Sequence, residues 1–391
     1  MSTTHKNILL SVTVIFIVGM IWYIDSTKPP AVAPTSIAIT ASSTTNAGTT
    51  TPSTSDRTQI LEQEAAMYSP AVELIPGGDP NATGTTAFGA PASSGFINTA
   101  PFKLQDVIGK KVILLDFWTY SCINCMRTLP YLEAWESKYG NQGLLILGVQ
   151  APEFDFEKDY NNVLAAVERL GINYPVMQDN NHATWDAYQN QYWPADYLIN
   201  IDGYITSTHF GEGDYAQTEA DIQAALTQRD QVLGLPGTVP TGTVNPSNAT
   251  PIRFDAVQSP ETYFGAARNE YLGNGTPSST GTQQLTIASS SVPQLNTLYL
   301  DGSWNFQNEY AGNQSVGAKI LYQYDAKNVY MVGSAQTPVD ITILVDGKVV
   351  GHQTIQGDQL YPIVQGAEYG QHTLEILINN PGLMAYTFTF G

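Results

Sequence analysis

The middle of the chain alternates short apolar runs with segments that have helical spacing. KVILLDFW (111–118) and GLLILGV (143–149) are continuously apolar and rich in β-branched or aromatic residues, which is typical of strands buried on both faces. Apolar positions three and four apart follow the first run, and a polar helix-like segment covers 156–170. Two later runs meet at the turn-forming pair 202–203. This alternation predicts an α/β domain over residues 76–230, with helices on both faces of a sheet.

The pattern changes to period two in the last third of the chain. Residues 339–345, 374–378 and 386–390 each place apolar side chains at alternate positions, and no amphipathic helix separates them. We therefore predict that residues 258–391 form an all-β sandwich, jelly-roll-like, with roughly 8 to 10 strands. The preceding stretch, 231–257, is rich in Gly, Pro, Thr and Asn and has no sustained periodicity, which indicates a linker.

The first residues have the pattern of a membrane anchor. Residues 7–24 carry no charge, and as a helix they reach roughly 27 Å, about one hydrocarbon core. We predict a cytoplasmic tip and transmembrane helix within 1–25, giving a single-pass protein whose globular part is extracytoplasmic, in the periplasm or at the cell surface. A signal peptide cleaved after 31–33 is the alternative. Residues 26–75, which begin rich in Ser, Thr and Pro, predict a disordered linker.

Composition excludes one class of partner. The formal net charge is −19, so the summed field repels phosphate backbones, and we expect no nucleic-acid binding. Only 13% of the residues are charged, about half the usual fraction. That composition suits a β-rich protein outside the cytoplasm.

The candidate chemistry lies in DFWTYSCINCMRTLP (116–130), which contains both cysteines of the chain. A helix that begins at Cys122 points its free amide groups at that sulfur, which lowers the thiol pKa and favours the attacking thiolate. Cys125 lies one turn later, where it is shielded and close enough to attack a mixed disulfide formed by Cys122. We therefore predict a redox-active CxxC pair.

Two other uses of the cysteines are less consistent with the sequence. A structural zinc site needs four ligands, whereas the five histidines are scattered, and only His209 is a candidate for a copper site with the two sulfurs. A purely structural disulfide across so short a ring constrains the unfolded chain little. We predict no metal site and no cofactor.

Several motifs resemble a known family. DFWTYSCINCMRTLP resembles the thioredoxin active-site segment, in which a buried Asp precedes the first Cys by six residues and a Pro follows the second by five, and Asp116 and Pro130 fill these positions. The inserted helix and strand around YPVM (174–177) resemble the membrane-tethered TlpA-like branch. APEFDFEK, YWPADYLI, FGEGDY and the terminal YTFTFG resemble the extracytoplasmic part of DipZ-type proteins, so the resemblance covers nearly everything after Phe96.

The resemblance implies roles for further residues. It makes Asp116 a buried carboxyl with a raised pKa, the base that deprotonates Cys125. It makes Pro194 a cis-proline beside the sulfurs. It also implies an apolar, substrate-binding set around Cys122, which consists of Trp118, Tyr120, Trp193 and Pro194. The three aromatic rings of this set equally suit ordinary core positions.

The expected function is a membrane-anchored extracytoplasmic thiol-disulfide oxidoreductase that exchanges with protein thiols and disulfides, with the reductase direction favoured. DipZ-type proteins carry a multi-span electron-importing domain, whereas a single span is predicted here. A reductase therefore needs a separate CcdA/DsbD-like membrane electron donor. One alternative is a thiol peroxidase, because Thr119 stands three residues before Cys122.

A second alternative is a cell-surface module that binds a glycan or a protein. The carboxyl-terminal region of DipZ-type relatives resembles carbohydrate-binding modules, and sugars stack on exposed aromatic rings. The candidate rings in this region are Tyr299, Trp304, Phe306, Tyr310, Tyr322, Tyr324 and Tyr330.

Overall fold

The computed structural model describes residues 54–288 and 292–391. The anchor predicted within residues 1–25 lies outside these ranges. Among the helices that the structure does describe, none is long and apolar enough to cross a membrane.

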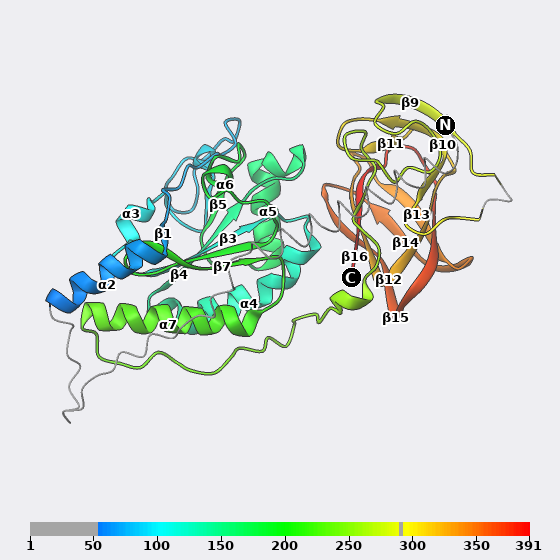
Figure 1. The fold of residues 1–391 in the computed structure, drawn as a ribbon. Helices are drawn as coiled ribbons and strands as arrows, with labels where there is room; N and C mark the ends of the chain where they lie inside the picture. The colour runs from blue at the N-terminus through cyan, green and yellow to red at the C-terminus, as the bar shows by residue number, and fades with distance from the viewer. Residues whose placement is uncertain (1–53, 289–291) are drawn as a thin grey trace, which may run out of the picture. The chain divides into compact units, whose positions relative to one another are not determined.

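The first folded region is built on a seven-stranded sheet with the order β1-β7-β6-β3-β4-β5-β2 (Figure 1). Its central strand, β3 (Val112–Trp118), pairs in parallel with β4 (Leu144–Gln150) and antiparallel with β6 (Ala195–Ile199). All seven residues of β3 are buried, as the continuous apolar run predicts. The other strands are β1 (Ser69–Pro70), β2 (Phe96–Ile97), β5 (Val176–Gln178) and β7 (Tyr204–Phe210).

Helices cover both faces of this sheet because alternate residues of β3 belong to different cores. Leu114 and Trp118 pack with α4 (Ile123–Tyr139), α5 (Tyr160–Leu170) and α7 (Tyr215–Leu233). Leu115 and Phe117 pack on the opposite face, where α3 (Leu104–Val107) and α6 (Ala183–Ala187) contribute Leu104 and Trp185. The predicted α/β domain is confirmed.

The predicted disordered linker extends too far. Its last part contains α2 (Thr54–Met67) followed by β1. The carboxylate of Glu64 is buried and accepts a hydrogen bond of 2.7 Å from Asn200, in the turn between β6 and β7. That partner lies more than a hundred residues away, so composition alone does not reveal it.

The connection between the two regions is held against the first one. α7 continues through Leu233, and the remainder contains one short 3₁₀ helix, η4 (Phe254–Ala256). The carbonyl of Gly242 accepts a 2.6 Å hydrogen bond from Lys138, and the amide of Val244 donates to Glu219 at 2.6 Å.

The second region contains nine antiparallel strands, β8 to β16. Two of them are long, β12 (Ala318–Ser334) and β15 (Gln359–Ile378), and they pair along most of their length. β12 pairs with β10 near its start and with β16 near its end, and β11 joins β10 to β16, which closes a circuit of strands. The predicted β-rich domain is confirmed, while its jelly-roll-like connectivity stays a prediction. The shorter strands are β8 (Thr262–Tyr263), β9 (Gly281–Leu285), β10 (Leu298–Phe306), β11 (Ala311–Asn313), β13 (Val339–Val345), β14 (Lys348–Ile355) and β16 (Met384–Phe390).

The aromatic rings considered for sugar stacking do not form an exposed platform. Five of the seven are buried: Trp304, Phe306, Tyr322 and Tyr324 lie in the core of the second region, and Tyr330 packs in a separate apolar cluster with residues of the first region. The other two, Tyr299 and Tyr310, are half-buried. Aromatic side chains on the core-facing side of a strand are buried, so the high aromatic content of this region is explained by core packing.

Gly265 offers a test of the packing that follows β8. A Cβ added there would lie 2.2 Å from the carbonyl carbon of Glu309 and 2.4 Å from the carbonyl oxygen of Asn308. Backbone atoms cannot move aside cheaply, so we expect Gly265→Ala to lower the free energy of unfolding by about 2 to 4 kcal/mol. Urea unfolding measures it. Gly351→Ala is the matched control, since nothing lies within 4 Å of its added Cβ. Equal stability of the two variants would contradict this account.

Candidate functional site

The two thiols lie where β3 passes into α4. Cys122 caps the helix, and its sulfur accepts a hydrogen bond from the amide of Cys125 at 3.3 Å. Both cysteines are free thiols; Cys122 is half-buried and Cys125 is buried. Burial raises the pKa of Cys125 well above its ordinary value, with further contributions from Cys122 and Asp116. One sulfur is therefore accessible while the other stays protonated beneath it.

Asp116 lies within the core beneath the dithiol. It is 1% exposed, and its Oδ1 atom has no hydrogen-bond partner. Burial, and then repulsion by Asp196, raise the pKa of Asp116 well above its ordinary value, which is the direction expected from the sequence.

Sequence reasoning missed Asp196. This residue stands directly opposite Asp116 in the β3–β6 pairing. Burial raises the pKa of Asp196 to about 7. The sequence signal that could have found it is the single carboxylate in the otherwise uncharged run ADYLI, which forms the buried strand β6.

Trp193 and Pro194 lie beside Cys122. The peptide bond between them is cis, as the family resemblance implies. The carbonyl oxygen of Trp193 is 4.0 Å from the Cys122 sulfur. Its indole packs against Trp185 with ring centroids 4.4 Å apart and donates to the carbonyl of Ala151 at 3.0 Å. These contacts fix the carbonyl of Trp193 next to the reactive sulfur.

Trp118 and Tyr120, the other two members of the predicted substrate-binding set, are not accessible. Trp118 is 0% and Tyr120 is 1% exposed. The Trp118 indole occupies the space above Gly148, where an added Cβ would lie 2.8 Å from its Nε1 atom, and Tyr120 packs against Phe156. The end of β3 lies deeper than the sequence suggests, so both rings are core residues and do not contact substrate.

A second buried carboxylate, Glu157, holds the loop that precedes Cys122. One of its oxygens accepts hydrogen bonds from the hydroxyls of Thr119 (2.5 Å) and Ser121 (2.6 Å). The other oxygen accepts from the amides of Glu153 (2.7 Å) and Phe154 (3.0 Å). Burial raises the pKa of Glu157 to about 7 despite these donors. Glu157 thus joins two loops, a role that its position in APEFDFEK did not reveal.

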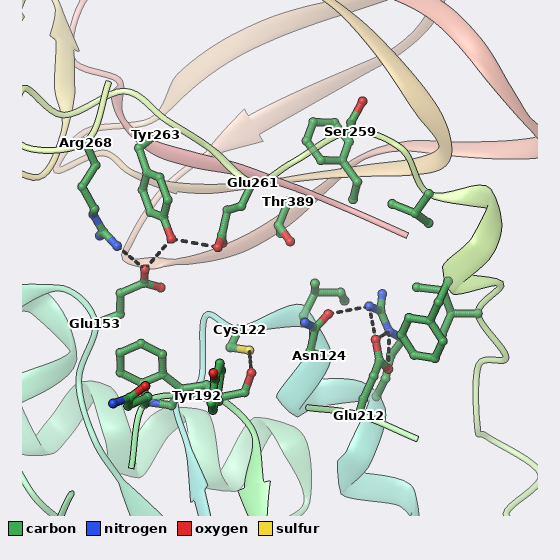
Figure 2. Close-up of a pocket in the computed structure, with 18 residues that line it drawn as sticks. Cys122, Asn124, Glu153, Tyr192, Glu212, Ser259, Glu261, Tyr263, Arg268 and Thr389 are labelled. Carbon is green, nitrogen blue, oxygen red and sulfur yellow. Dashed lines mark hydrogen bonds and ion pairs between the residues drawn. The ribbon is translucent and has the colours of Figure 1, made fainter. Parts of the chain in front are cut away.

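The carboxyl-terminal region packs against Ile123, one of the two residues between the cysteines. Ile123 is 7% exposed and shares an apolar cluster with Phe154 of the first region. The members from the second region are Tyr330, Val332, Leu360 and Tyr386. Beside this cluster Glu153 accepts hydrogen bonds of 2.8 Å from Arg268 and from the Tyr263 hydroxyl (Figure 2).

A cleft of about 450 Å³ opens over the Cys122 sulfur. Tyr192 and Asn124 line it from the first region, and Glu261 and Thr389 line it from the second (Figure 2). Asn124 also accepts a hydrogen bond from Arg127, whose guanidinium forms a buried ion pair with Glu212 at 2.6 Å. The Cys122 sulfur is therefore reached through a cleft lined by both folded regions.

The copper alternative finds no support in the arrangement of ligands. Within residues 54–288 and 292–391, no three or more His, Cys, Asp or Glu side chains gather closely enough to hold a metal ion. His209 lies on β7, opposite Asp196, and does not form such a group with the two cysteines.

Glu157 predicts a specific pH dependence of stability. Its folded-state pKa is near 7 and its ordinary value is 4.5, so the protein loses stability as the pH rises through 7 and Glu157 ionises in the fold. Glu157→Gln imitates the neutral acid. We expect the variant to gain about 2 to 4 kcal/mol relative to the wild type between pH 5 and pH 8. Urea unfolding at each pH measures it, with the exposed Glu168→Gln as control. Parallel stability curves for Glu157→Gln and wild type would refute the expectation.

Comparisons with known proteins agree with this geometry. Residues 86–208 match the AhpC/TSA family model, and residues 259–391 match the model described as thioredoxin like C-terminal domain. Protein DipZ of Mycobacterium tuberculosis is 36% identical over 302 residues, which are 76% of this chain and 42% of that protein. The chain thus spans less than half the length of this relative.

Two further similarities cover less than half of this chain. Thiol-disulfide oxidoreductase YkuV of Bacillus subtilis is 26% identical over 126 residues, which are 32% of this chain and 84% of that protein. A solved thiol:disulfide interchange protein from Chlorobium tepidum aligns with 41% of this chain and 97% of its own, at 20% identity and a TM-score of 0.31.

The dithiol at the start of α4, the cis-proline beside it and the matches over both folded regions agree. The first region is therefore similar to the AhpC/TSA family and has a thioredoxin-like fold, and the chain is similar to DipZ and to a named thiol-disulfide oxidoreductase.

Proposed function

We propose that this chain is an extracytoplasmic, membrane-anchored oxidoreductase that uses Cys122 and Cys125 as a redox-active pair on protein substrates. One observation carries the proposal: the Cys122 sulfur is accessible in a cleft at a helix start, and Cys125 is buried one turn below it. The charge-free stretch 7–24 supports the anchoring.

In the reductase direction the Cys122 thiolate attacks a substrate disulfide. A bond forms between Cys122 and one substrate sulfur, and the other substrate sulfur leaves and takes up a proton. Cys125 then loses its proton towards Asp116 and attacks the Cys122 sulfur, which releases the second substrate thiol. Substrate gains two electrons, the enzyme ends as the Cys122–Cys125 disulfide, and a CcdA/DsbD-like membrane donor restores the dithiol.

Substrate recognition is assigned to the walls beside Cys122. The fixed carbonyl of Trp193, beside the Cys122 sulfur, offers a hydrogen-bond acceptor to an extended chain, whereas the Pro194 carbonyl already accepts from the amide of Gly211. Tyr192, 54% exposed, adds a ring at the entrance. These features support a disulfide carried on a flexible protein segment as the substrate.

Trapping experiments test the division of roles. We expect Cys125→Ser to accumulate mixed disulfides with protein partners, because the attacking thiol remains and the resolving thiol is lost. Cys122→Ser should accumulate none, because Cys125 is buried. Non-reducing electrophoresis followed by mass spectrometry measures both. Equal trapping by the two variants, or trapping by neither, would contradict the assignment.

Equilibration with a glutathione redox buffer tests the direction of electron flow. We expect the wild-type pair to equilibrate at a potential near that of thioredoxin, about −270 mV, which suits a reductase. Quantifying thiols by alkylation and mass measures the reduced fraction. A potential near −120 mV, typical of a disulfide donor, would reverse the proposed direction.

A thiol peroxidase is the second candidate, because the matching family model is AhpC/TSA. In that reading Thr119 assists Cys122. However, Thr119 is fully buried and its hydroxyl donates to Glu157 at 2.5 Å, so it is directed away from the reactive sulfur. Consumption of peroxide with an external thiol donor, at a rate above that of disulfide reduction, would favour this candidate.

A further inference from the structure

Three titratable side chains form one row across the sheet beneath the dithiol. Asp116 on β3 is paired with Asp196 on β6, and Asp196 is paired with His209 on β7. Directly opposite residues of antiparallel strands project from the same face, with Cβ atoms about 4.5 to 5.5 Å apart. The row therefore begins below Cys125 and runs towards the edge of the sheet.

All three side chains keep a buried polar atom without a hydrogen-bond partner. These atoms are Oδ1 of Asp116, Oδ1 of Asp196 and Nε2 of His209. Buried polar groups in folded proteins are nearly always paired, and an unpaired one costs stability. Three such atoms on residues that face one another across three neighbouring strands require an explanation other than packing.

The number of protons that the two carboxyls can hold offers an explanation. Two buried carboxyls on facing positions do not both ionise, so the pair retains a proton near neutral pH. Asp116 is the more deeply buried of the two, 1% exposed against 6% for Asp196, so desolvation places the shared proton on Asp116. A protonated carboxyl accepts the Cys125 proton only if it passes its own proton on.

The row has one open end. On the other side of Asp116 the β3–β4 pairing places Gly148, which carries no side chain, and the Trp118 indole fills that space. At the His209 end β7 is the edge of the sheet, because β1 pairs only with Tyr204 and Ile205. His209 itself is half-buried, so it meets both the interior and solvent.

Few other titratable groups face the row. Cys125 comes from α4, and Tyr174, which precedes β5, has a pKa raised by burial and then by Asp116, Glu133 and Asp196. From α7, Asp221 accepts a hydrogen bond from Ser207 at 2.6 Å, two residues before His209. Neither Tyr174 nor Asp221 continues the register row.

We propose that Asp196 and His209 conduct the proton of Cys125 from Asp116 to solvent at the edge of the sheet. This proposal deepens the proposed function and rests on it. Asp196 and His209 act through Asp116 and do not touch the reacting sulfurs, so they are positioning residues for the proton.

The step balances without an added reagent. The S–H bond of Cys125 breaks and its proton moves to Asp116. Asp116 releases its own proton to Asp196, and Asp196 passes one to His209 and then to water. No direct hydrogen bond joins these three side chains, so each transfer uses a bridging water or a side-chain rotation. The electron pair left on Cys125 forms the bond to Cys122, and the bond between Cys122 and the substrate sulfur breaks.

A two-phase reaction with an aromatic disulfide, 5,5′-dithiobis(2-nitrobenzoate), separates the steps in the reduced full-length protein. Attack by Cys122 releases the first coloured thiolate, and attack by Cys125 releases the second. Stopped-flow absorbance between pH 5.5 and 9, in H₂O and in D₂O, follows both. The pH profile and the isotope effect of the second phase respond to proton transfer, whereas a loss of packing does not change them selectively.

We expect Asp196→Asn to slow the second phase about tenfold or more at pH 7. It should also shift the pH midpoint of that phase, raise its solvent isotope effect and leave the first phase unchanged. His209→Gln should slow the second phase by a smaller factor, about threefold. His352→Gln, in the second region, and Asp221→Asn are controls expected to retain the wild-type second phase.

Other outcomes overturn the inference. An unchanged rate and pH profile in Asp196→Asn, with Asp116→Asn slow, would restrict proton transfer to Asp116 alone. Equal slowing of both phases in Asp196→Asn, together with a lower melting temperature, would make the role of Asp196 structural. If Asp196→Asn does not fold, an unaffected second phase in His209→Gln would refute proton conduction through Asp196 and His209. A wild-type protein with no second phase would refute the proposed function instead.

Discussion

Complete burial of β3 is the constraint on which the rest of the site depends. The strand has sheet neighbours on both sides and helices on both faces, so its single carboxyl residue, Asp116, is only 1% exposed. An isolated charge there is unfavourable, and the pKa of Asp116 rises in consequence. The same burial extends to Cys125 and Asp196, whose pKa values also rise. The reactivity of Cys122 and Cys125 thus depends on the protonation of the buried carboxyls beneath them.

Glu157 links this interior to the carboxyl-terminal region. It fixes the loop before Cys122 through Thr119 and Ser121, and with its other oxygen it fixes the backbone of Glu153 and Phe154. Both of those residues contact the second region, Glu153 through an ion pair and Phe154 through an apolar cluster. The position of the β-rich region and the geometry of the dithiol loop are therefore joined by one buried carboxylate.

Charge in the cleft is arranged in pairs. Arg127 binds Glu212, and Arg268 binds Glu153, so each guanidinium that lines the cleft already has a carboxylate partner. The Tyr263 hydroxyl lies 2.8 Å from Glu153 and 2.7 Å from Glu261, and because it carries one hydrogen it donates to one of these carboxylates at a time. Buried ion pairs contribute more to fixed geometry than to net stability. The buried pair is Arg127–Glu212 of the first region, whereas the Arg268–Glu153 pair joins the two regions and its Arg is 40% exposed.

The sequence alone determined the elements and the reactive pair. Continuous apolar runs identified β3 and β4, alternation identified β13, β15 and β16, and the spacing of Cys122 and Cys125 at a strand-to-helix change located the dithiol. These features are local, because period and helix capping act over a few residues.

Tertiary structure decided which side chains reach solvent and which face one another. Trp118 and Tyr120 lie next to the reactive loop in sequence, yet the depth of β3 buries them. Asp196 and Glu157 stand far from the cysteines in sequence, but strand register and loop packing bring them beneath the site. Pairing between distant strands sets these positions, and a single strand's pattern does not encode its neighbour's register.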